Sequence, residues 1–221
     1  MHNKLYISSR SPLLSFENEI WKQGIVFIAG IDEAGRGPLA GPVVAAAAIL
    51  QKKTRIPAVN DSKQLSEKQR IQLKTLLLSI SGFRYAVSEI QADEIDRLNI
   101  LRATHLAMRR AVLQLPETEI ALVDGLKVPD MPVKCRFIVK GDAKSASIAS
   151  ASILAKIHRD EIMMSYAEKY PEYGFDRHKG YGTADHLKAL KKYGPCPIHR
   201  KSFAPVRDLI SPPPIQEELE F

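Results

Sequence analysis

Cysteine is nearly absent: the 221 residues include only Cys135 and Cys196. These two lie far apart and form neither a C-x-x-C metal pair nor a disulfide framework, so we expect ordinary thiols. Long apolar runs are missing as well, because the longest, residues 43–50, is far shorter than the roughly 18 residues of a spanning helix. Residues 1–20 also lack the apolar segment of a secretory signal. These absences argue against a membrane protein and a disulfide-rich secreted domain, and we expect a cytoplasmic protein.

Composition and length are typical of one globular domain. Hydrophobic residues make up 45% and charged residues 26% of the chain, which is enough to bury a core and excludes wholesale disorder. We expect a single domain over residues 1–210. The run Ser211-Pro-Pro-Pro214 marks a boundary, and residues 211–221 are expected to form a flexible, Pro-rich, acidic tail.

Positive charge exceeds negative charge: 32 Lys or Arg against 25 Asp or Glu give a net charge of +7 and a pI near 9.4. This balance suits a polyanionic partner such as nucleic acid. The excess is strongest between residues 178 and 207, where Asp185 is the one acidic residue. Flat side chains that can stack on sugars or bases are interleaved there, namely Tyr181, Tyr193 and Phe203. We expect a basic, helical, substrate-binding portion over about residues 178–210, the alternative being a solvated basic helix face.

Hydrophobic periodicity predicts alternating strands and helices. Strands are expected at residues 25–31, 43–50, 83–87, 119–124 and 134–139. Helices are expected at residues 15–21, 66–80, 93–115, 145–170 and 183–193, the second of them starting with a capping box. The alanines of residues 43–50 leave a helix open for that segment. The pattern predicts an α/β domain, a mixed sheet flanked by helices.

Acidic residues follow three of the predicted strands. Asp32 and Glu33 close the first strand, Asp124 closes the fourth, and Asp142 follows the fifth at the start of a helix. Several carboxylates in one place repel each other, so their convergence favours a hard cation such as Mg²⁺ or Mn²⁺. Adjacent strand residues point to opposite sides, so one of the first pair, Glu33, is expected to lean in from the following turn. Taken singly, Asp124-Gly125 is also a good turn pair and Asp142 a good helix cap.

A glycine-rich segment follows these first two acids. Gly35-x-Gly37-x-x-Ala40 matches the loose dinucleotide-binding fingerprint. Pro38 and Pro42 interrupt the helix which that fingerprint requires, and the next segment favours a strand, so we discount this interpretation. Glycines also let a backbone approach a ligand closely, and Arg36 between them can reach a phosphate or a ribose.

Several motifs occur in order along the chain: Gly30-Ile-Asp-Glu-Ala-Gly-Arg-Gly-Pro-Leu-Ala-Gly-Pro42, Asp61-Ser-Lys63, Val123-Asp-Gly125, Lys140-Gly-Asp142, Ala151-Ser-Ile-Leu-Ala-Lys156, His178-x-Gly-Tyr-Gly-Thr183 and His199-Arg-Lys-Ser-Phe203. Together they resemble the type 2 ribonucleases H, and bacterial ribonuclease HII in particular. The resemblance implies a ribonuclease H-like fold with a helical C-terminal region. It also implies an endonuclease that cleaves the RNA strand of RNA/DNA hybrids and incises DNA at embedded ribonucleotides.

The resemblance assigns roles to the acids. Asp32, Glu33, Asp124 and Asp142 match the family's four metal-binding, catalytic carboxylates. Asp160 competes for the fourth place, but it lies about 27 Å beyond Asp142 along a continuous helix. The implied mechanism is hydrolysis with two divalent cations, Mg²⁺ or Mn²⁺, giving 5′-phosphate and 3′-hydroxyl ends.

The resemblance also assigns substrate-binding residues. Gly35, Arg36 and Gly37 match the loop that reads the ribose 2′-hydroxyl, the group that separates RNA from DNA. Tyr181 matches the tyrosine that stacks on the sugar at an RNA-to-DNA junction, its alternative being a core tyrosine. Lys63 is expected near a phosphate, although a surface turn at residues 61–63 fits nearly as well.

Partners other than the duplex are suggested by the tail. Gln216, Leu219 and Phe221 have the spacing of bacterial sliding-clamp-binding motifs, the alternative being a frayed acidic tail. We expect a monomer. Two rival functions remain at this point: a non-catalytic RNA-binding protein, which leaves the four acids unexplained, and a DNA-cutting nuclease with the same acid cluster.

Overall fold

The computed structural model describes residues 11–52 and 66–211. The predictions for Lys63 and for the tail residues Gln216, Leu219 and Phe221 lie outside these ranges. None of the helices in the described ranges is long and apolar enough to cross a membrane.

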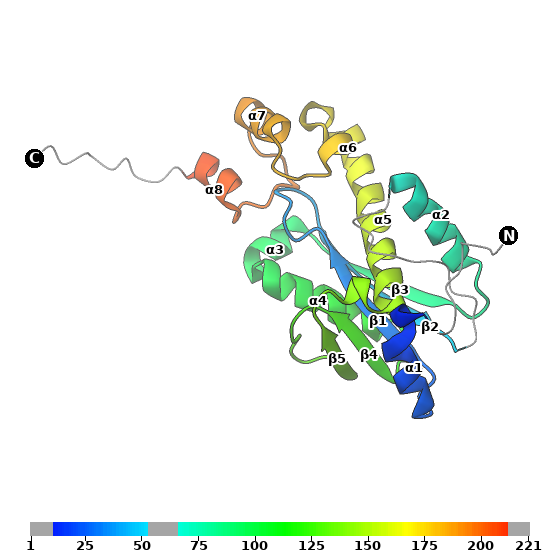
Figure 1. Ribbon diagram of the computed structural model, residues 1–221. Helices are drawn as coiled ribbons and strands as arrows, with labels where there is room; N and C mark the ends of the chain where they lie inside the picture. Colours follow the sequence, from blue (N-terminus) through cyan, green and yellow to red (C-terminus); the bar gives the residue numbers. More distant parts are fainter. Residues whose placement is uncertain (1–10, 53–65, 212–221) are drawn as a thin grey trace, which may run out of the picture.

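A five-stranded mixed sheet forms the centre of the described chain (Figure 1). Its strands are β1 (Ile28–Ala34), β2 (Val43–Leu50), β3 (Arg84–Ile90), β4 (Ile120–Asp124) and β5 (Lys134–Ile138), in the order β3-β2-β1-β4-β5. β2 is antiparallel to both of its neighbours, whereas β4 runs parallel to β1 and to β5. The carboxyl ends of β1, β4 and β5 therefore meet at one edge of the sheet.

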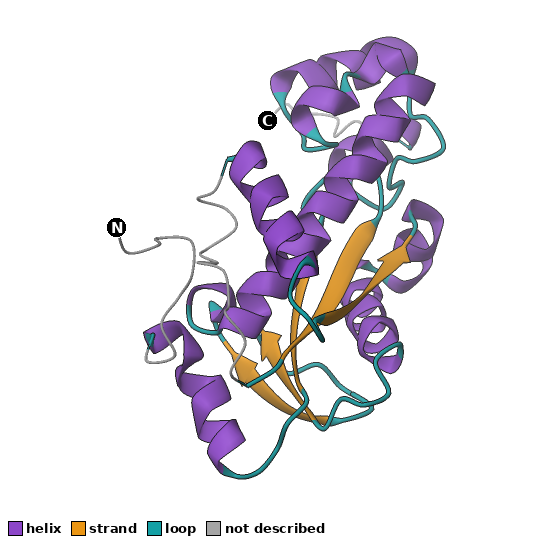
Figure 2. Ribbon diagram, turned by 90° about the vertical axis from the view of Figure 1, so that its right-hand side faces the viewer, coloured by secondary structure: helices purple, strands orange, loops and turns teal. Residues whose placement is uncertain are grey.

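Both faces of the sheet are covered by helices (Figures 1 and 2). Alternate residues of β1 and β2 pack against α4 (Ile100–Leu113) on one face and α5 (Ala146–Lys169) on the other. At Gly30 an added Cβ would lie 2.0 Å from the backbone carbon of Ser147, so α5 packs directly on β1. Every residue of β2 is buried, and its alanines let both helices approach. The α/β prediction is confirmed, and residues 43–50 form a strand and not a helix.

The other helices of the described ranges are shorter. They are α1 (Ser15–Lys22), α2 (Glu67–Leu78), α3 (Ala92–Leu98), α6 (Phe175–His178), α7 (Ala184–Tyr193), α8 (Ala204–Ile210) and the 3-10 turns Pro12–Leu14, Gly141–Ala143 and Pro171–Tyr173. The predicted capping box of α2 is present, since Ser66 N–H donates to Gln69 Oε1 at 2.8 Å and Gln69 N–H to Ser66 Oγ at 3.3 Å.

The prediction of one helix over residues 93–115 is wrong. Asn99 has a φ of 68° and breaks the segment into α3 and α4. Its side-chain oxygen accepts a hydrogen bond from Arg102 N–H at 3.1 Å, which caps α4. Asparagine tolerates positive φ and caps helices well, so it ends one helix and starts the next without an intervening loop.

The first strand begins and ends three residues later than the predicted range, residues 25–31. β1 continues to Ala34 because its last residues pair with β2, Asp32 opposite Ala46 and Glu33 opposite Ala45. The two acids therefore lie within the strand and not beyond its end.

The N-terminal helix α1 docks on the start of α5 through one carboxylate. Glu17 is fully buried, and its Oε1 accepts hydrogen bonds from Ser145 Oγ at 2.6 Å, Ser147 N–H at 2.9 Å and Ser147 Oγ at 2.7 Å. A carboxylate is favourable there because the helix N-terminus carries partial positive charge and unpaired N–H groups. α1 thus fixes the end of α5 that lies nearest the strand carboxylates.

The helices α6, α7 and α8 gather beyond one end of the sheet, around the far end of α5 (Figures 1 and 2). The sequence predicted α7, with Thr183 as its cap, but neither α6 nor α8. The basic portion expected to bind substrate, about residues 178–210, is exposed only in part. Arg200 is fully buried, and Phe203 packs against the core with the Arg200 guanidinium over its ring, whereas Tyr181 and Tyr193 are exposed.

Candidate active site

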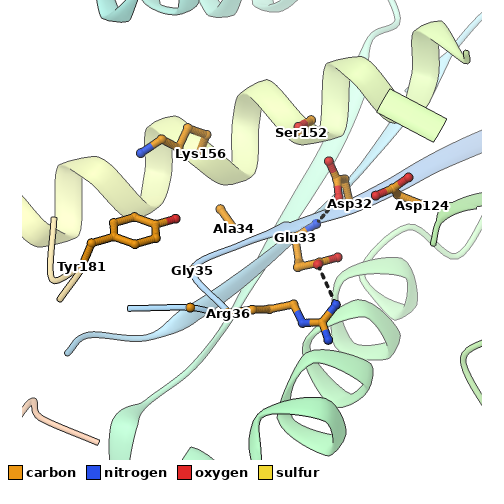
Figure 3. A pocket seen from close by; sticks show the side chains of 10 residues that line it. Asp32, Glu33, Ala34, Gly35, Arg36, Asp124, Ser152, Lys156 and Tyr181 are labelled. Carbon is orange, nitrogen blue, oxygen red and sulfur yellow. Dashed lines mark hydrogen bonds and ion pairs between the residues drawn. The ribbon is translucent and has the colours of Figure 1, made fainter. Parts of the chain in front are cut away.

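A cavity of about 250 Å³ opens where β1 and β4 end, beside α5 (Figure 3). Three carboxylates line it, those of Asp32, Glu33 and Asp124. The rest of its wall comes from residues 34–37, from Ser152 and Lys156 of α5, and from Tyr181. The structure therefore brings together most of the described residues that the sequence predicted for the site. Asp142 does not line this cavity.

Strand geometry explains how the three carboxylates meet. Ile31 pairs with Val123 across the parallel strands, so the next residues, Asp32 and Asp124, come side by side on the α5 face. Glu33 points to the α4 face, where it also lines a second hollow with α4 residues. It accepts a hydrogen bond from Arg36 Nη1 at 3.4 Å. Asp32 and Glu33, which are adjacent in β1, thus reach the cavity from opposite faces of the sheet at the end of the strand.

Asp32 carries the clearest electrostatic signature. Burial raises the pKa of this carboxyl well above its ordinary value, and the charges of Glu33 and Asp124 raise it further. Hydrogen bonds from the Ser152 side chain and from the Glu33 N–H oppose the shift. Like charges crowded into a buried place are stabilised by a cation. A cation in the cavity would therefore stabilise the ionised forms of these carboxyl groups.

The donor set fits a divalent cation by charge and by chemistry, since carboxylate oxygens are the ligands that Mg²⁺ and Mn²⁺ prefer. Within the described ranges, no three Asp, Glu, His or Cys side chains are already arranged to hold a metal ion. A bound cation would offset the repulsion among these carboxylates, which contributes to the raised pKa of Asp32.

Asp142 lies beside Asp124 through the backbone. Gly141 N–H donates to Asp124 Oδ1 at 2.5 Å, and Asp142 follows it in a 3-10 turn with 4% of its surface exposed. Its own Oδ1 accepts from Ala143 N–H at 3.0 Å, while Ser145 caps α5. The alternative role of Asp142 as the cap of α5 is therefore wrong.

Asp160, the competitor for the fourth place, lies elsewhere. Its Oδ1 accepts from Lys156 Nζ at 2.6 Å, and its side chain lines a separate hollow between α2 and α5. It therefore faces away from the cavity that holds Asp32.

Two buried arginines hold the loop after β1. Arg200 is fully buried and donates to the carbonyl oxygens of Gly35 at 2.6 Å, Arg36 at 2.9 Å and Gly41 at 3.0 Å. Burial and, after it, the charge of Arg159 lower the pKa of Arg200 to about 9, so the guanidinium is still charged at neutral pH. This fork fixes the carbonyls of the loop on its inner side.

Arg159 of α5 continues the same arrangement. Its guanidinium, 1% exposed, donates to the carbonyl oxygens of Pro42 at 3.0 Å, Ala40 at 3.1 Å and Lys179 at 3.0 Å. Gly35 has a φ of 93°, and a Cβ there would lie 2.1 Å from Arg159 Nε. Glycine is therefore required at this position by both conformation and space.

Tyr181 stands opposite the glycine loop. Its side chain is 46% exposed, and a Cβ added to Gly37 would lie 3.7 Å from its ring. Behind it, the backbone oxygen of Tyr181 lies 2.9 Å from His186 Nδ1, and His186 Nε2 lies 3.1 Å from His199 Nε2. Burial lowers the pKa of His186, and burial followed by the proximity of His186 lowers the pKa of His199 to about 4. Tyr181 thus lines the cavity, with its backbone held by buried histidines, and is not a core residue.

Comparison with known proteins decides the family. The family model described as Ribonuclease HII matches residues 29–206. The chain belongs to the ribonuclease HII family. The ribonuclease HII of Chlamydia pneumoniae is 53% identical over 199 residues, covering 89% of this chain and 92% of that protein.

Solved structures agree with this family. The structure of ribonuclease H2 from Pyrococcus horikoshii OT3 has a TM-score of 0.66 and 29% identity, covering 83% of this chain and 96% of that one. The PCNA:RNase HII complex from Archaeoglobus fulgidus gives a TM-score of 0.69 and 25% identity, covering 80% of this chain and 95% of the matched one. As a ribonuclease HII, the chain is an endonuclease that hydrolyses the RNA strand of RNA/DNA hybrids. The non-catalytic RNA-binding alternative is therefore wrong.

Sequence reasoning gave no role to four residues of this ribonuclease HII site: Ser152, Lys156, Arg159 and Arg200. The first three recur at spacings of four and three residues on α5, which places them on one helix face. That spacing is a signal that the sequence offered. No comparable signal marks Arg200, because its partners are carbonyls distant in sequence.

Replacing Asp32 by asparagine is expected to stabilise the metal-free protein at pH 8, by roughly 2–4 °C in Tm for about 1 kcal/mol. A raised folded-state pKa means that the wild type loses stability as pH rises through that pKa, because ionisation is disfavoured in the fold. Asparagine does not ionise, so the difference should vanish at pH 4. Thermal unfolding in chelator at both pH values measures it, and a variant less stable than wild type at pH 8 would contradict the account.

Proposed function

We propose that this ribonuclease HII also incises DNA beside single embedded ribonucleotides, using two divalent cations, Mg²⁺ or Mn²⁺. The observation that carries the proposal is the convergence of three carboxylates on a cavity whose other wall is the glycine loop and Tyr181. Asp32, Glu33 and Asp124 would hold the cations, with Asp142 joining them beside Asp124. When bound, the cations would supply a water of lowered pKa and stabilise the departing 3′ oxygen, giving 5′-phosphate and 3′-hydroxyl ends.

The chain's own residues orient this chemistry. Ser152 hydrogen-bonds the Asp32 side chain, and Gly141 N–H fixes Oδ1 of Asp124. Lys156 lines the cavity while its Nζ donates to Asp160. Its positive charge on the wall would attract the phosphate that the carboxylates alone would repel.

Recognition of the ribose falls to the opposite wall. The carbonyls of Gly35 and Arg36 are taken by Arg200, so the inner side of the loop is occupied and its outer side remains for substrate. A Cβ added to Gly37 would be in ordinary contact with the Tyr181 ring at 3.7 Å, so the loop and the ring stand close together and a sugar would bind beside them, on the cavity side. We assign the 2′-hydroxyl to Gly35, Arg36 and Gly37, and sugar stacking to Tyr181. Lys63 stays a prediction for a phosphate contact.

The test is cleavage of four end-labelled duplexes in Mg²⁺ and in Mn²⁺: all-DNA, RNA/DNA hybrid, double-stranded RNA, and DNA with one ribonucleotide. Metal-dependent incision beside the single ribonucleotide, with all-DNA intact, is the expected result. Cutting of all-DNA would instead support the DNA-nuclease alternative and remove the 2′-hydroxyl role from the glycine loop.

We further propose that residues 215–221 bind a sliding clamp through Gln216, Leu219 and Phe221. The support is their spacing in the sequence, together with the Archaeoglobus fulgidus protein, a relative solved in complex with PCNA. Removing residues 215–221 is expected to lower affinity for the bacterial clamp at least about tenfold while leaving duplex cleavage unchanged. Surface plasmon resonance on immobilised clamp measures this, and equal affinity with and without the segment would refute it.

A further inference from the structure

Two hollows continue the catalytic cavity across α4. The first is lined by Glu33, Arg36 and Asp124, which it shares with the cavity, and by Leu101, His105 and Leu126. The second shares His105 with the first and adds Arg102 and Arg109. The shared residues join the hollows into one groove, which we call the α4 groove, leading from the carboxylates across the helix to its face with Arg102 and Arg109.

The spacing of its basic side chains follows the helix. Arg102, His105 and Arg109 stand at i, i+3 and i+7 of α4 and therefore lie on one face. Seven residues of helix rise by roughly 10 Å. Duplex DNA advances about 3.4 Å per base pair along each strand, so this stripe matches about three base pairs.

The charge of the α4 groove is positive beyond its catalytic end. Arg102 and Arg109 line it there, against Asp130. His105 lines both hollows, and burial, followed by the charges of Arg109 and Arg36, lowers its pKa. Arg109 is held in place, since its Nη1 donates to the Pro129 carbonyl at 3.1 Å.

Between the catalytic end and the arginines, the groove has an apolar stretch. Leu101 is 50% exposed and Leu126 is 81% exposed, although both are large hydrophobic residues. An alternation of exposed apolar groups and fixed cations fits a nucleic acid strand, whose sugars are apolar and whose phosphates are anionic.

We propose that the α4 groove binds the duplex flanking the cut, with Arg102 and Arg109, on either side of His105, holding phosphates over a stretch of about three base pairs. This inference rests on the proposed function, because it takes the cut to lie at the carboxylates. It adds a binding track on the α4 side, in addition to the glycine loop and the C-terminal helices. An acidic protein segment is the other class of partner that such charge would suit, and the experiment below separates the two.

The test uses the full chain and the double variant Arg102→Ala/Arg109→Ala. The matched control is Arg97→Ala/Arg110→Ala, which removes the same charge from α3 and α4. Those two arginines are paired with Asp93 and Glu94 and do not line the groove. Fluorescence anisotropy without added metal gives the affinity for duplexes with one ribonucleotide and DNA flanks of 2 or 12 base pairs, on either side.

The groove variant is expected to lose about tenfold in affinity for a duplex extended on one side and nothing for the short-flanked duplex. The slope of log affinity against log salt should fall by about 2, since two phosphate contacts are lost. The control should match wild type in both respects. Unchanged affinity of the groove variant for every duplex would overturn the proposal and leave a protein partner for this surface.

Cleavage of the short-flanked duplex in Mg²⁺ separates this inference from the function on which it rests. Wild-type cleavage there, together with the flank-dependent loss of binding, supports both. Wild-type failure to cut any ribonucleotide-bearing duplex would refute the proposed function, while the anisotropy result would still decide whether the groove binds a flank.

Discussion

Replacing Asp124 by asparagine is expected to lower cleavage of an RNA/DNA hybrid at least about a thousandfold while duplex affinity stays within about threefold of wild type. The variant removes one negative charge from the cavity, and that charge is required to hold a cation. Asparagine keeps an oxygen that can accept from Gly141 N–H, so the turn that carries Asp142 should remain in place. Single-turnover cleavage in Mg²⁺ and anisotropy with the same duplex measure the two quantities.

The control for Asp124 is Asp93→Asn, a carboxylate with 81% of its side chain exposed on α3. It removes the same charge without lining the cavity, so its rate should match wild type. Retained cleavage by the Asp124 variant at ordinary Mg²⁺ would remove Asp124 from the site.

Replacing Arg200 by lysine is expected to lower Tm by about 6–12 °C and kcat/KM about a hundredfold. An ammonium cannot reach three carbonyls in the fork geometry of a guanidinium, and each lost charge-assisted hydrogen bond costs about 1.5–3 kcal/mol. The carbonyls of Gly35, Arg36 and Gly41 would lose their shared donor, and the loop would no longer be fixed. Circular dichroism melting and steady-state kinetics with a ribonucleotide-bearing duplex measure both effects.

Arg207→Lys is the matched control, because Arg207 lies exposed on α8 in the same basic portion and pairs with Asp208 at 2.9 Å. Its Tm and kinetics should be those of wild type. If Arg200→Lys lowered Tm without changing kinetics at a temperature where it is folded, the loop would not depend on this fork for its function.

The acid cluster was predictable because acidic residues stand at or just after the ends of three predicted strands. Acids at the ends of parallel strands must meet at one sheet edge, and Asp32 and Asp124 do so through a register that puts them side by side. The exact end of β1 was not predictable, because its last residues are held in the sheet by β2 alone. Glu33 is therefore a strand residue on the opposite face of the sheet from Asp32, whereas the sequence predicted that it leans in from the following turn.

The division of the helical segment at residues 92–113 was missed for a different reason. Apolar periodicity continues across Asn99, and the break depends on one backbone conformation which that residue tolerates. The capping box of α2, by contrast, is written in two side chains three residues apart and was found.

Arg200 shows where sequence reasoning ends. In the sequence it is one more cation in a basic stretch, and only the tertiary fold shows that it is buried against carbonyls more than a hundred and fifty positions away. The same holds for Arg159, whose partners lie on two different loops. Part of the positive charge that predicted nucleic acid binding therefore belongs to buried arginines, which hold the loop after β1.

We expect the carboxylate cavity to cut beside a ribose 2′-hydroxyl that the glycine loop on the opposite wall binds. This expectation is tested most directly by two DNA duplexes that are identical except for one ribose 2′-hydroxyl, each incubated in Mg²⁺ and in chelator, with product ends mapped. The account predicts one incision, beside the ribonucleotide, in Mg²⁺ alone, leaving 5′-phosphate and 3′-hydroxyl ends. Incision of the all-deoxy duplex at the same place, or incision of either duplex in chelator, would contradict it.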